Sequence, residues 1–328
     1  MSEGGGGRWR SRERWEYLFT KQSGVEVEIR HIIPVQGPFR LGTALNVLQR
    51  YEAPKRNPAR TVRYTASFEV PGGAVEVIVR QEEPGGPLDV RLLGKLVDDT
   101  VADLVVGRLI RMFSLGLNPT GFFEKAEEDP HLRLILALYP DLRPVLYPTP
   151  FEGAVRTLLA LRLPGEEAAQ LAANVREVCG IVPADRPHAE PAFPGKWTLL
   201  AVSDRLLEVA GVPERKVARI KRLCSALVGE PDLLDHLQTF ADPMKARRIL
   251  ETLPGIGRRV AEHLLLRAYG FQDVLFEDDR LFLAVKRFYK LPDIPDVTTV
   301  ERLAEPFIPW RSWWMFLLTV AHETSVIV

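Results

Sequence analysis

The stretch from Leu253 to Asp279 constrains this chain most, because it specifies two helices joined by a tight glycine turn. Apolar residues at helical spacing lead into Leu253, and Pro254 and Gly255 then end that helix. Proline cannot continue a helix, and glycine tolerates unusual backbone angles. A second apolar stripe begins after Gly257 and predicts another helix. Such a turn exposes backbone N–H groups at a helix N-terminus, where they can hold a phosphate oxygen.

Charge around this turn favours binding of an anion over an ordinary connection between helices. The turn alone is equally compatible with both interpretations. Six basic residues flank it, namely Lys245, Arg247, Arg248, Arg258, Arg259 and Arg267. Acidic residues then arrive together at Glu277, Asp278 and Asp279, the last of them 22 positions after Gly257.

These features resemble the helix-hairpin-helix DNA glycosylases, most closely the bacterial 3-methyladenine DNA glycosylase II (AlkA) branch. The carrying segments are 253–257, 266–267, 278–279 and 309–312, and Pro150–Arg156 resembles the helix that opens the family's central helical domain. The resemblance covers residues 25–328 and is strongest near the C-terminus. It implies that Asp279 is the catalytic carboxylate. It also implies that a hairpin binds a DNA phosphate through Gly255, Gly257 and Arg258, with Ile256 shaping the turn.

The chemistry of base excision suits a single carboxylate at Asp279. Cleavage of an N-glycosidic bond builds positive charge on the sugar, which a carboxylate stabilises while it orients the attacking water. One carboxylate suffices when the base leaves readily, as a cationic alkylated purine does, and the base must first be flipped out of the duplex. The alternative is that Asp278 or Asp279 only caps a helix. Capping and catalysis are compatible, and Asp278 is the less favoured catalyst.

Arg259 predicts a monofunctional enzyme. Bifunctional relatives place a Schiff-base lysine two residues after the second hairpin glycine, and this chain has Arg259 there. Arginine stays protonated and cannot act as an amine nucleophile. We therefore expect no AP-lyase activity. Lys286 could replace that lysine only on paper, because it lies on the far side of the aspartate in sequence.

The base pocket departs from the family pattern. The AlkA branch has aromatic residues where this sequence has Arg259, His263 and Thr319. A cationic base prefers aromatic faces to an arginine, so these residues also fit a neutral lesion that His263 and Thr319 read by hydrogen bonds. The alternatives are a solvent-facing histidine and a core threonine.

The wedge that fills the gap left by a flipped base is altered as well. In relatives it follows the first helix of the central domain, where this sequence has Arg162 and Leu163. Either residue could fill the gap. An exposed arginine with no such role is an equal alternative.

Composition limits the partners. Lys plus Arg equals Asp plus Glu at 43 each, so DNA contacts must come from local segregation of charge. The basic segment 214–222 is either a solvated helix face or a phosphate contact. Two cysteines are too few for a disulfide framework, and no apolar run approaches ~20 residues, so we expect no membrane span. We expect a cytoplasmic, nucleoid-associated monomer that binds double-stranded DNA containing a damaged base.

The predicted fold is mainly α with a small α/β N-terminal domain, in the helix-hairpin-helix DNA glycosylase architecture. The expected parts are a flexible basic arm (1–24), a small α/β scaffold (25–116), a central helical domain (148–279, hairpin 253–258), and a second helical domain (117–147 plus 280–328), with the active-site cleft between the helical domains. No cofactor is expected. Family hairpins bind a monovalent cation on their carbonyls, so a sodium or potassium ion is the one metal considered.

Three functional hypotheses follow. The first is a monofunctional glycosylase for a damaged, alkylated or otherwise modified purine. The second is a glycosylase for a deaminated or oxidised base, which the polar pocket favours. The third is a non-catalytic protein that binds damaged DNA, against which the spacing of Asp279 argues.

Overall fold

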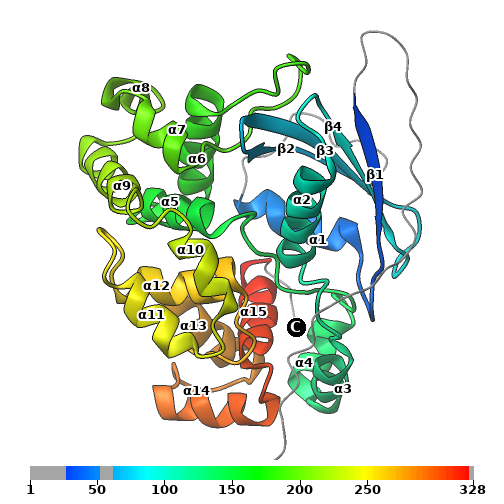
Figure 1. Cartoon of the computed structure of the whole chain (residues 1–328). Helices are drawn as coiled ribbons and strands as arrows, with labels where there is room; N and C mark the ends of the chain where they lie inside the picture. Colours follow the sequence, from blue (N-terminus) through cyan, green and yellow to red (C-terminus); the bar gives the residue numbers. More distant parts are fainter. Residues whose placement is uncertain (1–26, 52–61, 325–328) are drawn as a thin grey trace, which may run out of the picture.

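A four-stranded antiparallel sheet forms the N-terminal part of the chain (Figure 1). The structure, a computed structural model, describes residues 27–51 and 62–324, so the predicted arm at 1–24 lies outside the described residues. The strands lie in the order β1 (Glu28–Ile33), β4 (Leu88–Leu93), β3 (Gly73–Gln81) and β2 (Arg63–Val70). The pair Gly72–Gly73 predicts a hairpin turn between two strands, and the pairing of β2 with β3 confirms it. Gly72 adopts φ +88°, which favours glycine.

Two helices pack on this sheet and share its core. They are α1 (Leu41–Tyr51) and α2 (Asp99–Met112). Asp98 starts α2 by accepting a hydrogen bond from the Val101 N–H at 2.8 Å, as an N-cap should. Central strand β3 is buried along most of its length and on both faces. Val75, Val77 and Val79 lie in the core shared with the helices, and on the opposite face Glu76 pairs with Arg186 at 2.6 Å.

The central segment from Pro150 to His236 is mainly helical, apart from a non-helical stretch at 180–195. Its helices are α5 (Pro150–Ala160), α6 (Gly165–Cys179), α7 (Lys196–Ala201), α8 (Asp204–Val209), α9 (Glu214–Ala226) and α10 (Leu233–His236). The apolar spacing over 198–210 predicts a single helix, and this prediction is wrong. Ser203 accepts a hydrogen bond from the Leu206 N–H and begins α8 as a separate helix.

The two predicted helices joined by the glycine turn follow, with one irregularity. Helices α11 (Pro243–Leu250) and α12 (Arg258–Leu264) flank the turn, which the Ile256 N–H closes by donating to the Leu253 carbonyl at 3.1 Å. Helix α12 then widens into a π-helix, Leu265–Tyr269, where the sequence predicts continued α-helix. Gly270 ends it at φ +70°. Such π segments often occur at functional sites.

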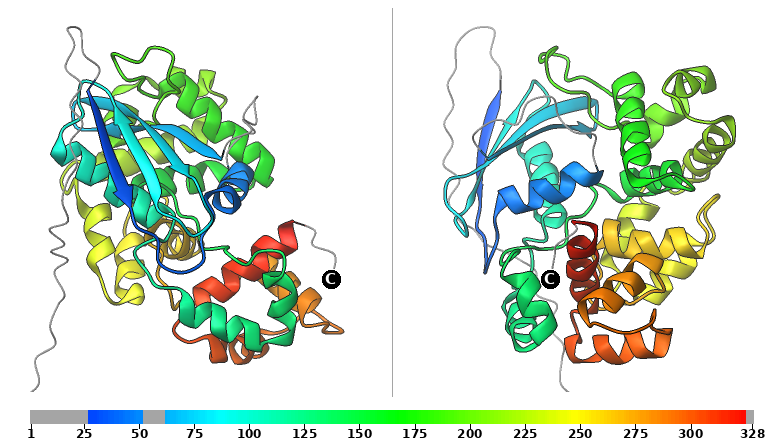
Figure 2. Two further views of the ribbon diagram at one scale, coloured as in Figure 1. Left: turned by 90° about the vertical axis from the view of Figure 1, so that its right-hand side faces the viewer. Right: turned by 180° about the vertical axis from the view of Figure 1, so that it is seen from behind.

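Two segments that are distant in sequence lie side by side below the sheet (Figures 1 and 2). The earlier one holds α3 (Thr120–Glu128) and α4 (Pro130–Leu136), and the later one holds α13 (Asp279–Phe288), α14 (Val297–Ala304) and α15 (Arg311–Glu323). An apolar, Trp-rich final helix predicts that its tryptophans are core residues, and Trp313 and Trp314 of α15 are buried as this predicts.

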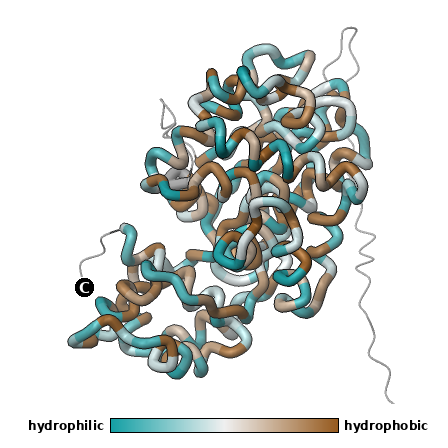
Figure 3. Tube along the Cα trace, turned by 90° about the vertical axis from the view of Figure 1, so that its left-hand side faces the viewer, coloured by the Kyte–Doolittle hydropathy of each residue, from teal (hydrophilic) through white to brown (hydrophobic). Residues whose placement is uncertain are grey.

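The buried residues form two hydrophobic clusters. We call them core A, which joins the sheet, α1 to α4 and α13 to α15, and core B, which joins the helices from α5 to α12 with the π-helix. Both cysteines are buried in core B. Hydrophobic and hydrophilic residues alternate along the helices (Figure 3). The mainly helical fold with a small N-terminal sheet is confirmed, while the predicted domain boundaries stay a prediction.

Candidate active site

A cavity of about 570 Å³ gathers most of the predicted site residues. It lies where the turn after α5, helix α12 and the start of α13 meet. Five predicted residues line it together: Arg162, Leu163, Arg259, His263 and Asp279. A smaller adjoining cavity of about 60 Å³ shares His263, and Thr319 lies there instead.

Asp279 and Asp278 have different surroundings at the start of α13. Asp278 is the N-cap and accepts a hydrogen bond from the Arg280 N–H at 2.8 Å, and its carboxylate pairs with the Arg280 guanidinium at 3.2 Å. Burial raises the pKa of Asp278, but the charge and hydrogen bonds of Arg280 outweigh it and lower that pKa overall. Asp279 is exposed, and its carboxylate has no hydrogen-bond or ion-pair partner among residues 27–51 and 62–324. Its carboxylate is therefore available to a ligand.

His263 faces the cavity as a neutral imidazole. Burial, with added repulsion from Arg267 and Arg280, lowers the pKa of His263 to about 3. Its Nε2 lies 3.4 Å from the Tyr147 hydroxyl. A neutral imidazole offers one donor and one acceptor. The alternative of a solvent-facing histidine is therefore disfavoured.

Tyr147 adds an aromatic ring at a position that the family pattern does not include. Its ring lines the main cavity together with Phe276, and the guanidinium of Arg267 lies 5.8 Å from its centroid. The family's aromatic positions lie on the hairpin helix and on the last helix, so that pattern does not point to Tyr147. Its position just before the helix-opening segment at Pro150 was the available signal.

Thr319 is less suited to base recognition than predicted. Its hydroxyl lies 2.9 Å from the Met315 carbonyl and 3.0 Å from the Phe316 carbonyl, both within its own helix α15. The hydroxyl hydrogen of Thr319 is therefore bonded within the helix, and its oxygen can only accept a further hydrogen bond. Arg259, in contrast, is exposed and borders the main cavity.

The turn after α5 separates the two candidate wedge residues. Leu161 and Leu163 are partly buried and pack against core B. Arg162 between them is exposed and adopts φ +61°, a left-handed conformation that costs a residue with a side chain about 1 kcal/mol. Arg162 therefore stands at the apex of the turn.

The predicted hairpin has a different electrostatic setting from the one expected. Gly255 adopts φ +82°, so the glycine is required there. Arg258, which we expected to bind a phosphate, already donates to the buried carboxylate of Glu262 at 2.8 Å. Arg247 reaches the same carboxylate at 3.2 Å. Arg258 is thus paired within the protein.

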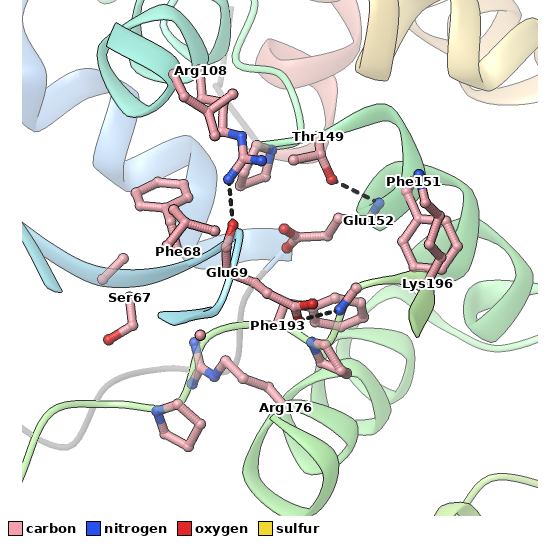
Figure 4. A pocket seen from close by; sticks show the side chains of 18 of the residues that line it. Ser67, Phe68, Glu69, Arg108, Thr149, Phe151, Glu152, Arg176, Phe193 and Lys196 are labelled. Atoms are coloured by element: carbon pink, nitrogen blue, oxygen red, sulfur yellow. Dashed lines mark hydrogen bonds between the residues drawn. The ribbon is translucent and has the colours of Figure 1, made fainter. Parts of the chain in front are cut away.

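A second cavity, of about 510 Å³, lies between the sheet and the central helices (Figure 4). Arg108 donates to the Glu69 backbone carbonyl at 2.7 Å, and the Glu69 side chain accepts from the Gly195 N–H and the Thr198 hydroxyl. Burial raises the pKa of Glu69, although these two hydrogen bonds oppose that rise. This cavity holds none of the predicted site residues, so we assign the chemistry to the cavity of Asp279.

Two further searches cover the described part of the chain. Among residues 27–51 and 62–324, no group of three or more His, Cys, Asp or Glu side chains is arranged to hold a metal ion. Within the same ranges, every helix is too short or too polar to cross a membrane.

Comparison with known proteins decides the family. No family model matches the chain. A curated relative, DNA-3-methyladenine glycosylase 2 of Escherichia coli, is 30% identical over 217 residues, which is 66% of this chain and 71% of the relative. The chain belongs to the AlkA-type helix-hairpin-helix DNA glycosylases. This assignment confirms the resemblance stated above, and it makes the chain a DNA glycosylase of base excision repair.

Solved structures share the fold of this AlkA-type chain. The 3-methyladenine DNA-glycosylase from Archaeoglobus fulgidus matches 91% of this chain and 100% of its own, with a TM-score of 0.77 and 20% identity. The 8-oxoguanine glycosylase/lyase of Clostridium acetobutylicum matches 87% of this chain and 93% of its own, with a TM-score of 0.60 and 14% identity. Both likenesses concern the fold alone.

Proposed function

We propose that this chain is a monofunctional DNA glycosylase that flips a damaged purine from duplex DNA and hydrolyses its N-glycosidic bond with Asp279. One observation carries the proposal. The carboxylate of Asp279, which has no partner among the described residues, lines the same cavity as the apex turn with Arg162 and the hairpin helix α12. A carboxylate, a wedge and a base-sized cavity are the parts that base excision requires.

Asp279 would act on the sugar of the flipped nucleotide. As the base leaves, positive charge develops at C1′, and the nearby carboxylate stabilises it and orients a water for attack. Asp278 is held by Arg280 and is the weaker candidate, although it lines both cavities. The Tyr147 ring offers the flipped base a face on which to stack.

The hairpin would anchor the DNA strand. The amides at Gly255 and Gly257 precede α12, where the helix dipole favours an anion. Backbone carbonyls are suitable ligands for a monovalent cation, and the Leu253 carbonyl already closes the turn. A sodium or potassium ion on the hairpin carbonyls therefore stays a prediction.

A neutral base is the second candidate substrate. His263 is neutral with its pKa lowered to about 3, so it can donate one hydrogen bond and accept another. Arg259 brings a positive charge to the cavity wall, which opposes binding of a cationic alkylpurine. A deaminated or oxidised purine would avoid this repulsion.

Single-lesion duplexes containing 3-methyladenine, 7-methylguanine, ethenoadenine, hypoxanthine, uracil or 8-oxoguanine test the proposal. We expect base release from at least one purine lesion, with strand cleavage only after alkali, because Arg259 cannot form a Schiff base. Cleavage without alkali would refute monofunctionality. Binding without release from any duplex would favour the non-catalytic alternative.

A glycine at position 162 should separate stability from activity. Arg162→Gly relieves the left-handed strain and should stabilise the fold by about 1 kcal/mol. It also removes the wedge, so we expect excision to fall about tenfold, which corresponds to ~1.4 kcal/mol in the barrier. Chemical denaturation and single-turnover excision measure the two effects.

Arg162→Ala provides the control. Alanine keeps the strained backbone but loses the side chain, so its stability should stay near that of the wild type while excision falls as it does in Arg162→Gly. Wild-type excision by both variants would instead transfer the wedge role to Leu163.

A further inference from the structure

The basic face of α9 meets the hairpin at one residue. A Cβ placed on Gly255 would overlap Cγ and Cδ of Arg219. The aliphatic part of Arg219 therefore lies directly against the hairpin backbone, and the glycine makes that approach feasible. The sequence left this face open between a solvated surface and a phosphate contact, and this contact distinguishes Arg219 from the rest of it.

Helix α9 also reaches the other predicted DNA contact. The Lys216 ammonium, one turn before Arg219, donates to the Leu159 carbonyl near the end of α5. The apex turn with Arg162 starts two residues later. Lys216 and Arg219 thus lie between the apex turn and the hairpin.

Arg219 contrasts with three basic residues at the hairpin, each of which has an acidic partner. Arg258 pairs with Glu262, and the α11 residues Arg247 and Arg248 pair with Glu251 or Glu262 and with Asp242, respectively. Arg219 has no ion pair or side-chain hydrogen bond within the part of the chain that the structure describes. Burial and the nearby Arg219 charge lower the pKa of Lys216. Two adjacent cations without an acid are electrostatically unfavourable unless an anion joins them.

We propose that Arg219 binds a DNA phosphate. It would contact the same DNA strand as the hairpin, from the opposite side of that strand. The inference rests on the proposed function. A phosphate approaching the amides of Gly255 and Gly257 would also meet the free guanidinium of Arg219, which suits phosphate oxygens in its geometry. Arg219 would then provide a cationic contact beside Arg258, which the family pattern assigns to this role but which already pairs with Glu262.

Salt dependence of binding tests this role. Each neutralised phosphate contributes about 0.9 to the slope of log affinity against log salt. We expect Arg219→Gln to bind a duplex with a tetrahydrofuran abasic-site analogue about five- to tenfold more weakly at 0.1 M salt, with the slope smaller by about 0.9. Arg219→Lys should keep most of the slope, because it keeps the charge. Fluorescence anisotropy at several salt concentrations measures both quantities.

Arg222→Gln is the matched control on the same helix. Arg222 is exposed, and its Nε donates to the Ala218 carbonyl at 3.2 Å within α9, so its slope should change less than that of Arg219→Gln. Thermal melting confirms that each variant is folded. Equal slopes for Arg219→Gln and wild type, with excision by wild type intact, would overturn the phosphate role alone. A wild type that neither binds the duplex nor releases a base would overturn the proposed function as well.

Discussion

Asp279→Asn should reduce excision of the preferred lesion by about 100-fold or more, with little loss of stability or DNA affinity. The amide has nearly the shape of the carboxylate but cannot neutralise the positive charge that develops on the sugar. Asp279 is exposed and lacks a protein partner among the described residues, so its replacement leaves no buried group unpaired. Single-turnover base release, together with binding to an abasic-site duplex, measures the effect.

Asp278→Asn is the control, because it changes the neighbouring carboxylate by the same chemistry. Asparagine caps helices about as well as aspartate, so α13 should still begin at the same place. It weakens the ion pair with Arg280, which at 53% exposed side chain contributes little. Excision should therefore stay within a few-fold of wild type. A larger loss in Asp278→Asn than in Asp279→Asn would reverse the assignment of the catalytic carboxylate.

Arg111→Met should destabilise the protein by about 2–4 kcal/mol and also slow excision. Arg111 extends from α2 to three backbone carbonyls: Nη1 lies 2.6 Å from Ala268 O and 3.3 Å from Tyr147 O, and Nη2 donates to Pro148. Burial lowers the pKa of Arg111 to about 10, but it stays charged at neutral pH. Methionine fills similar space and leaves the carbonyls without their donor, at about 1–3 kcal/mol for each group that stays dry.

The slower excision follows from the position of those carbonyls. Ala268 belongs to the π-helix that continues the hairpin helix, and Tyr147 lines the cavity. Arg133→Met is the matched control, because Arg133 makes a single exposed bond to the Glu127 carbonyl at 3.0 Å; we expect it to stay within about 0.5 kcal/mol. Urea denaturation measures stability. If Arg111→Met and Arg133→Met had the same free energy of unfolding, the hydrogen bonds of Arg111 to the three carbonyls would not stabilise the fold.

Periodicity and turn residues predicted most helices and the β2–β3 hairpin, because both depend on local spacing. The π-helix at 265–269 was not predictable in this way, since one extra residue in a turn hardly alters the apolar stripe. Ser203 carried a visible capping signal, but the apolar pattern on either side of it concealed the break between α7 and α8. Local rules describe segments, and these errors occur where a segment changes its geometry inside an apolar run.

The candidate site was predictable where the family motif is continuous in sequence. Asp279, His263 and Arg259 line one cavity as expected. Tyr147 was missed because its place depends on how the loop before α5 folds back against α12. The pairing of Arg258 with Glu262 was also not predicted, although the two residues lie four positions apart on one helix, a spacing that favours ion pairs. Roles of these residues in catalysis stay predictions.

Cores A and B each carry a different part of the proposed machinery. Asp279 begins α13, whose buried side packs in core A, whereas the hairpin and the apex turn belong to elements of core B. A strand anchored on the hairpin would therefore present its nucleotide to a carboxylate that is carried by a separately packed body. The distance between the hairpin and the carboxylate of Asp279 is then set by how cores A and B pack against each other. Selection of a lesion would thus depend on the span between the hairpin and Asp279 as well as on contacts to the base.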